Sequence, residues 1–366
     1  MRLLLTILFL GFLQFGFSQF KKPTFISISQ KGGFIFGHRP NMSHLIQKNS
    51  YAFELGIWQQ ETGNDDTTFR LKNPMRGLAF EFRNFGNDDV LGKAFSITEY
   101  MVFPMYHGKN NFCLDLTMGT GIGFLTKRYN KFENPTNNAI GSVVNARVNV
   151  KLSLTKYTKK MHFGLGMEIA HFSNGAVKNP NLGINAPSIS FLLGYNFDEH
   201  QVLKYDARKE RRKGIKLPNP HQLLVELIGS AKEIGAIPFF PKLYPVVATR
   251  ISYGYSKRGL WGVDGGMDVI YNESIFHKYN DTTFVRNDIL QIGLYAGGFV
   301  NFYKSQIVFG LGYNVRDKID PEGRIYNRIG LRYWFHKKWF GLFTIRANYG
   351  KADYFEFGIG YQILRW

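Results

Sequence analysis

The segment from His171 to Gly175 has the sequence HFSNG, which places a histidine two residues before a serine. A serine hydrolase needs this combination, because a base must take the hydroxyl proton as the oxygen attacks a carbonyl carbon. Side chains at positions i and i+2 of a β-strand lie on the same face. If the segment is a strand, His171 and Ser173 lie close enough for proton transfer, and the pair predicts hydrolysis of an ester or amide.

The residues before this pair predict the strand and its two faces. An apolar row alternates with small or polar residues, as in a membrane β-barrel whose strands have a lipid face and a lumen face. The apolar row consists of Leu165, Met167 and Ile169, and the lumen row consists of Gly164, Gly166, Glu168 and Ala170. His171 and Ser173 continue the lipid-facing row. Polar residues also end such rows where ordinary strands leave the membrane, so the triplet alone leaves that alternative open.

Similar alternation recurs along the chain and predicts about sixteen strands. The first eight are predicted at 24–37, 50–59, 75–85, 92–106, 112–128, 142–157, 160–173 and 187–197. The second eight are predicted at 222–232, 245–256, 259–272, 288–303, 305–314, 325–336, 339–349 and 354–364. An even number of strands suits a closed barrel, and the aromatic end at Trp366 resembles the assembly signal of bacterial barrels. The sequence therefore predicts an all-β protein, an antiparallel transmembrane β-barrel of the outer membrane.

Residues 199–220 form a connector between the two sets of strands, and its basic cluster from Arg208 to Lys213 is typical of a solvated linker. The segment FLLGYNF, which ends at Phe197, resembles a second barrel ending halfway along the chain. The strands therefore close either as one barrel or as two tandem eight-stranded barrels. Because tandem membrane barrels are rare, we expect a single barrel.

The first residues predict export. Arg2 precedes an apolar run from Leu3 to about Leu13 that is too short to span a bilayer, and the small residues near Ser18 suit a signal peptidase. We therefore expect residues 1–18 to be a signal peptide and the mature chain to reach the bacterial outer membrane. With a periplasmic N-terminus, the seventh strand runs outward and places His171 and Ser173 at the rim beside the outer leaflet.

The formal net charge of +19 would also suit nucleic-acid binding, but the export signal and the strand pattern favour an anionic membrane surface or lipid. The lone Cys113 excludes an internal disulfide. The nine histidines lack the paired spacing of a zinc site, so we expect neither a metal nor a cofactor. The sequence carries no signal for an oligomeric state.

The segment HFSNGAVKNPNLGIN, from His171 to Asn185, resembles the outer-membrane lipid A 3-O-deacylases, the PagL or acyloxyacyl hydrolase-like family. The resemblance extends diffusely over residues 20–198. Members are eight-stranded barrels with a His-x-Ser-Asn motif on the outer barrel surface. The resemblance implies that His171 is the general base, Ser173 the nucleophile, and Asn174 an oxyanion-hole contributor together with backbone N–H groups such as that of Gly175. Asn181 and Gly183 match the Pro-Asn-x-Gly turn that follows in the family.

The chain departs from the family at the third member of the triad, because the family glutamate falls on Asn185. Asn185 shares parity with the lipid-facing residues of the eighth predicted strand, so we expect it next to His171. Asparagine can orient a histidine, but it lacks the charge that stabilises an imidazolium. A carboxylate from a neighbouring loop, such as Glu133, is the alternative.

These residues favour a serine esterase that removes an ester-linked acyl chain from lipid A or a related lipid. The alternative is a barrel without catalysis, either a porin-like channel or a lipid-binding pseudoenzyme whose triad has decayed. Residues 19–198 then form the deacylase-like half, and residues 221–366 form a second half of strands without a visible site.

Overall fold

The computed structural model describes residues 24–60, 74–197, 219–234, 242–257, 259–279, 285–302, 304–319, 323–348 and 351–366. The predicted signal peptide and the basic cluster Arg208–Lys213 lie outside these residues. Within the described ranges, no helix is long and apolar enough to cross a membrane.

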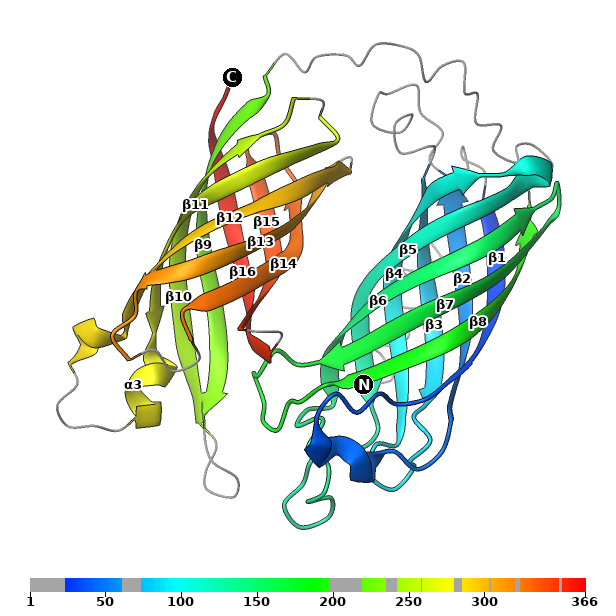
Figure 1. Cartoon of the computed structure of the whole chain (residues 1–366), viewed down its shortest axis with the longest axis horizontal. Helices are drawn as coiled ribbons and strands as arrows, with labels where there is room; N and C mark the ends of the chain where they lie inside the picture. Colours follow the sequence, from blue (N-terminus) through cyan, green and yellow to red (C-terminus); the bar gives the residue numbers. More distant parts are fainter. Residues whose placement is uncertain are drawn as a thin grey trace, which may run out of the picture.

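The first eight strands close into an antiparallel barrel (Figure 1). They are β1 (Thr24–Gly33), β2 (Ser50–Gln60), β3 (Met75–Asn84), β4 (Lys93–His107), β5 (Phe112–Leu125), β6 (Val144–Tyr157), β7 (Met161–Ser173) and β8 (Ile184–Asn196). Neighbours in sequence pair with each other, and β8 returns to pair with β1, with Leu193 opposite Ile28. The β1–β2 loop contains the short 3-10 helix η1 (Pro40–Leu45), and η2 (Lys109–Asn111) lies between β4 and β5.

The last eight strands close into a second antiparallel barrel. They are β9 (His221–Ile234), β10 (Lys242–Tyr255), β11 (Trp261–Asn272), β12 (Leu290–Phe302), β13 (Ser305–Arg316), β14 (Ile325–Trp334), β15 (Trp339–Asn348) and β16 (Lys351–Arg365). The helix α3 (Glu273–Tyr279) and the 3-10 helix η4 (Arg286–Ile289) follow β11. The chain ends by pairing β16 with β9, where Ile359 lies opposite Leu227.

The predicted class of an antiparallel β-barrel with sixteen strands is confirmed, but the expectation of one large barrel was wrong. The architecture is the tandem alternative. The physical reason is that β1 bonds to β2 along one edge and to β8 along the other. Neither edge of β1 is therefore free to pair with the second set of strands. The aromatic segment that ends at Phe197 thus closes a barrel of its own, as the sequence of the last strand does.

The alternation in sequence becomes two chemically different faces in each barrel. On β6, for example, Val148, Val150, Leu152 and Leu154 are exposed on the outside, whereas Arg147, Asn149 and Lys151 are buried in the lumen. An outward apolar row is stable only because lipid replaces water around it, whereas the inward row must satisfy its polar groups within the barrel.

Charged networks fill both lumens. In the first barrel Lys31 Nζ lies 2.9 Å from Glu54, 2.8 Å from Glu81 and 3.0 Å from Glu168, and the Lys31 side chain is fully buried. In the second barrel Arg250 contacts Glu226 at 2.6 Å and Asp268 at 2.6 Å, again without exposure to solvent. Lys31 and Arg250 thus each have oppositely charged partners, as burial of a charge in a low-dielectric interior requires. Within the described residues, buried ion pairs therefore cross the lumen of each barrel.

This packing predicts the result of a conductance measurement. Protein reconstituted into planar bilayers is expected to give no stepwise conductance, because the buried ion pairs block both lumens. Regular single-channel steps from the wild type would contradict the packed lumens. A known open porin incorporated in the same membranes serves as the positive control.

Candidate active site

The outer end of β7 carries the predicted pair on the lipid-facing side of the first barrel. His171 lies opposite Val148 and Ser173 opposite Ala146 of β6, all in outward rows. Between them Phe172 points inward, is fully buried, and forms a T-shaped contact with Phe85, with ring centroids 5.5 Å apart. This inward anchor fixes the parity of the strand end, so His171 and Ser173 must face outward.

An apolar cluster caps the outer mouth of the barrel and holds the loops around the site. Its members come from η1, from the β3–β4 and β5–β6 loops, and from β5, β7 and β8; they include Met42, Leu45, Phe85, Leu91, Leu125, Ile140, Phe172 and Ile184. The loop after β7 covers Ser173, which is 3% exposed. Ser173 therefore lies on the outer wall of the barrel but is shielded from bulk water.

The structure places Asn185 directly beside His171. The two residues are cross-strand partners on β7 and β8, and the His171 Nδ1 to Asn185 Oδ1 distance is 2.7 Å. Because an amide oxygen only accepts hydrogen bonds, this contact puts the imidazole proton on Nδ1 and leaves Nε2 as a free base. Asparagine thus orients the ring in the tautomer that catalysis requires.

Sequence reasoning missed His38, which extends this chain of contacts. Asn185 Nδ2 donates to His38 Nδ1 at 3.0 Å, and the neighbouring Phe36 forms an isolated bridge with Asn185. His38 lies in the β1–β2 loop, far from Asn185 in sequence. His38 could have been found by considering barrel closure, because an eight-stranded barrel places the outer end of its first strand beside the start of its eighth.

The Ser173 hydroxyl is held by Asn181 and by the following turn. Asn181 Nδ2 donates to Ser173 Oγ at 2.9 Å, Gly175 N–H donates to the same oxygen at 3.2 Å, and the hydroxyl faces Asn181 Oδ1 at 3.2 Å. Among the described residues, the hydrogen bonds of this hydroxyl thus go to Asn181 and Gly175 and not to His171. The strand register nevertheless places His171 and Ser173 on the same face of β7.

The structure gives the two predicted oxyanion residues different positions. The Asn174 side chain donates to Ser142 Oγ at 2.8 Å and to the Lys178 carbonyl at 2.8 Å, so it braces the turn. The Asn174 backbone N–H donates to Asn181 Oδ1 at 3.0 Å. Gly175 adopts a φ of +61°, a region open to glycine, and aims its N–H at Ser173. Gly175 N–H and Asn181 Nδ2 are therefore the two donors whose hydrogen bonds converge on Ser173 Oγ.

Glu133, the alternative carboxylate, is occupied within its own loop. It is exposed, and its Oε2 accepts a hydrogen bond from Asn130 Nδ2 at 3.3 Å. The partner of His171 Nδ1 in the structure is Asn185. Within the described residues, no group of three or more His, Cys, Asp or Glu side chains could hold a metal ion.

Gly183 gives a sharp test of how the histidine is positioned. Its φ is +80°, and a Cβ there would lie 2.7 Å from His171 Cε1. Gly183→Ala is expected to displace the imidazole and lower the rate of ester hydrolysis roughly 100-fold, with a loss of about 1–2 kcal/mol in stability from the left-handed backbone. Hydrolysis kinetics and thermal unfolding of the purified variant provide the measurement.

The matched control for that change is Gly32→Ala in β1, where no heavy atom lies within 4 Å of the added methyl group. This variant is expected to retain wild-type activity. Full activity in Gly183→Ala would show that hydrolysis does not require the close packing of the His171 imidazole against residue 183.

The second barrel touches the loop that follows β7 (Figure 1). Glu233 at the outer end of β9 accepts a hydrogen bond from Asn179 N–H at 2.5 Å, and the Glu233 N–H donates to the Ala176 carbonyl at 3.1 Å. A Cβ at Gly175 would lie 2.3 Å from the ring of Phe355 on β16, so this ring packs directly against the turn beside Ser173. The loop that carries the candidate oxyanion donor thus rests on the second barrel.

Comparison with known proteins follows the division into two barrels. Residues 50–196 match the family described as lipid A 3-O-deacylase (PagL). Residues 221–366 match the domain described as acyloxyacyl hydrolase, C-terminal domain (PagL_C). The first range covers β2 to β8, and the second covers β9 to β16. The first barrel therefore matches the PagL family, and the second barrel matches a domain described as the C-terminal part of an acyloxyacyl hydrolase.

The similarity to solved structures is low. The crystal structure described as the outer membrane enzyme PagL is 15% identical, with 45% of this chain and 97% of that chain covered at a TM-score of 0.33. The crystal structure of Neisserial surface protein A is 11% identical, with 48% and 97% covered at a TM-score of 0.31. No curated protein matches the chain in sequence. The family assignment rests on the two sequence matches.

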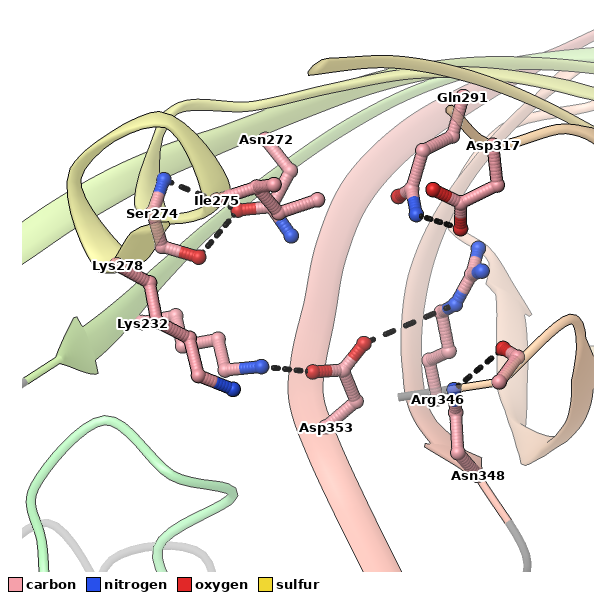
Figure 2. Close-up of a pocket in the computed structure, with 11 residues that line it drawn as sticks. Lys232, Asn272, Ser274, Ile275, Lys278, Gln291, Asp317, Arg346, Asn348 and Asp353 are labelled. Atoms are coloured by element: carbon pink, nitrogen blue, oxygen red, sulfur yellow. Dashed lines mark hydrogen bonds and ion pairs between the residues drawn. The ribbon is translucent and has the colours of Figure 1, made fainter. Parts of the chain in front are cut away.

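Among the described residues, the outer mouth of the second barrel shows no equivalent of the His171–Ser173 pair (Figure 2). That mouth holds a cavity of only about 10 Å³. Its polar side chains are engaged with one another: Lys232 pairs with Asp353, Gln291 donates to Asp317 at 2.5 Å, and Ser274 donates to Asn272 at 2.5 Å.

Proposed function

We propose that this protein is an outer-membrane serine esterase that removes an ester-linked acyl chain from lipid A or a related lipid. The observation that carries the proposal is the outward position of His171 and Ser173 on β7, with His171 Nδ1 2.7 Å from Asn185 Oδ1. A site on the outer wall meets lipid acyl chains, whereas soluble substrates reach lumens and loops. The match of the first barrel to the PagL family supports the same substrate class.

The reaction begins when Ser173 rotates from Asn181 towards His171. As Ser173 Oγ forms a bond to the ester carbonyl carbon, its proton passes to His171 Nε2. The tetrahedral intermediate then breaks the bond to the sugar oxygen, which leaves as an alcohol with the proton from His171. Water attacks the acyl-enzyme with His171 again as the base, and the products are a fatty acid and the free serine.

The negative charge of the tetrahedral intermediates develops on the former carbonyl oxygen, one bond away from Ser173 Oγ. Gly175 N–H and Asn181 Nδ2 lie 3.2 and 2.9 Å from Ser173 Oγ, so they are the donors best placed to form hydrogen bonds to this oxyanion. Asn174 contributes by bracing the turn through Ser142 and Lys178, and its own N–H becomes available when Asn181 moves with the oxyanion.

Mass spectrometry of lipid A tests the proposed function directly. Cells that express the wild type are expected to show lipid A species that lack one ester-linked acyl chain, together with the released fatty acid. Unchanged lipid A and phospholipids in cells with a correctly assembled barrel would overturn the proposal.

The second candidate is a lipid-binding barrel without turnover. The observation that favours it is Asn185, because a neutral amide cannot stabilise the imidazolium by charge. The porin-like alternative fits less well, because paired charges fill both lumens. Binding of lipid A without any change in its mass would identify the lipid-binding protein.

A further inference from the structure

A groove between the barrels passes beside the candidate nucleophile and is lined by its neighbours Ala146 and Asn174. It has a volume of about 480 Å³, within the size range of small-molecule sites. One wall belongs to β5, β6 and the loop after β7, and the other belongs to β15 and β16. The lining residues include Ile122, Val144, Ala146, Asn174, Val177 and Phe357. Ala146 is the direct cross-strand neighbour of Ser173, so the groove lies immediately beside the nucleophile.

The second barrel supplies an aromatic wall to this groove. Phe343 packs on Phe355 and Phe357, with ring centroids 5.1 and 5.0 Å apart. Phe357 and the next outward residue of β16, Ile359, are each 54% exposed, whereas Phe355 in the same row is only 8% exposed. The difference arises because Phe355 is covered by Gly175 of the first barrel. The aromatic wall is therefore fixed at the catalytic turn and open to a ligand further along.

The groove is polar at one end and apolar along its length. Ser142, Asn174 and Lys178 lie at the loop end, and Lys178 is half exposed beside Glu233. Below them the groove is lined mainly by apolar strand residues, such as Ile122, Val144 and Ala146, from rows that otherwise face lipid. A ligand with an ester or sugar group at one end and a hydrocarbon chain at the other fits this gradient. A soluble substrate would leave the apolar surface without a partner.

We propose that this groove binds the acyl chain of the lipid substrate, and that the second barrel determines chain specificity through Phe343, Phe355 and Phe357. The inference rests on the proposed esterase function and assigns the C-terminal barrel a role in it. The ester carbonyl lies at Ser173, and the hydrocarbon extends along Ala146 and Ile122 against the aromatic wall. The contacts between Glu233 and the loop keep the two walls in register.

The first experiment compares two esters in detergent micelles, p-nitrophenyl acetate and p-nitrophenyl palmitate. The double variant Phe343→Ala/Phe357→Ala removes the open part of the wall and leaves Phe355 in place against Gly175. Its kcat/KM for the palmitate ester is expected to fall about ten-fold or more, while hydrolysis of the acetate ester is unchanged. Phe309→Ala removes an equally exposed aromatic ring from β13 and is expected to alter neither. Equal effects of the double variant on both esters, or none on either, would overturn the inference.

The second experiment detects binding of an acyl chain in the groove and does not depend on hydrolysis. A palmitate analogue with a terminal diazirine is photolysed with the full-length protein, and labelled peptides are identified by mass spectrometry. Labelling of β15 or β16 together with β5 or β6 supports the groove, even if the wild type hydrolyses nothing and the esterase proposal fails. Hydrolysis of both esters without labelling of β15 or β16 would leave the esterase intact and overturn the role of the second barrel.

Discussion

Ser173→Ala is expected to abolish release of the acyl chain, with a loss of roughly 10³-fold or more in kcat. The reason is that Ser173 Oγ forms the covalent bond to the acyl group in the proposed reaction. The hydrogen-bond donors of Gly175 and Asn181 cannot replace this oxygen. Lipid A from cells that express the variant should carry its full set of acyl chains. The measurement is mass spectrometry of lipid A beside the wild type.

Loss of folding has to be separated from loss of chemistry in this experiment. Ser29→Ala is the matched control, because Ser29 is a buried serine of the same barrel whose hydroxyl has no hydrogen-bond partner among the described residues. Both variants should assemble into the outer membrane in similar amounts. Deacylation by a folded Ser173→Ala protein at the wild-type rate would exclude Ser173 as the nucleophile.

Replacement of Asn185 is expected to change activity in both directions. Asn185→Asp keeps the size of the side chain and adds a negative charge at the atom that lies 2.7 Å from His171 Nδ1. The charge stabilises the imidazolium that forms in the transition state, so kcat should rise about ten-fold or more. Asn185→Ala removes the hydrogen bond that orients the ring, and kcat should fall about ten-fold. Ester hydrolysis by the purified proteins measures both effects.

The control for added charge is Asn110→Asp in the turn between β4 and β5, which is exposed at the opposite end of the barrel. It should leave kcat unchanged. If the aspartate and alanine variants of residue 185 both behave like the wild type, Asn185 does not act through His171. A rise in kcat with aspartate would mean that Asn185 occupies the position of the family glutamate and orients the imidazole without supplying its charge.

The strands of this protein were predictable because their information is local. Alternation with a period of two residues identifies a strand and its two faces from a few neighbouring side chains. All sixteen predicted segments correspond to strands of the structure, with ends that differ by only a few residues. The same local rule placed His171, Ser173 and Asn185 on the lipid-facing side of the first barrel.

Barrel closure was not predictable in the same way. Alternation specifies which face of a strand meets lipid, but it does not specify which edges pair at the end of the sheet. The outcome depended on whether β8 bonds to β1 or continues to β9, and the pairing of Leu193 with Ile28 decided it. Local sequence contains this choice only as the resemblance between two aromatic strand endings.

The sequence by itself determined the membrane barrel, the position of the candidate base and nucleophile on one strand, and the asparagine that stands where the family has a carboxylate. Only the tertiary structure brought in His38 through closure, Asn181 through the fold of its loop, and Phe355 through contact between the barrels. The physical reason is one of range. Side chains at i and i+2 share a face in any strand, whereas contacts across a closure or between two barrels depend on how complete sheets meet.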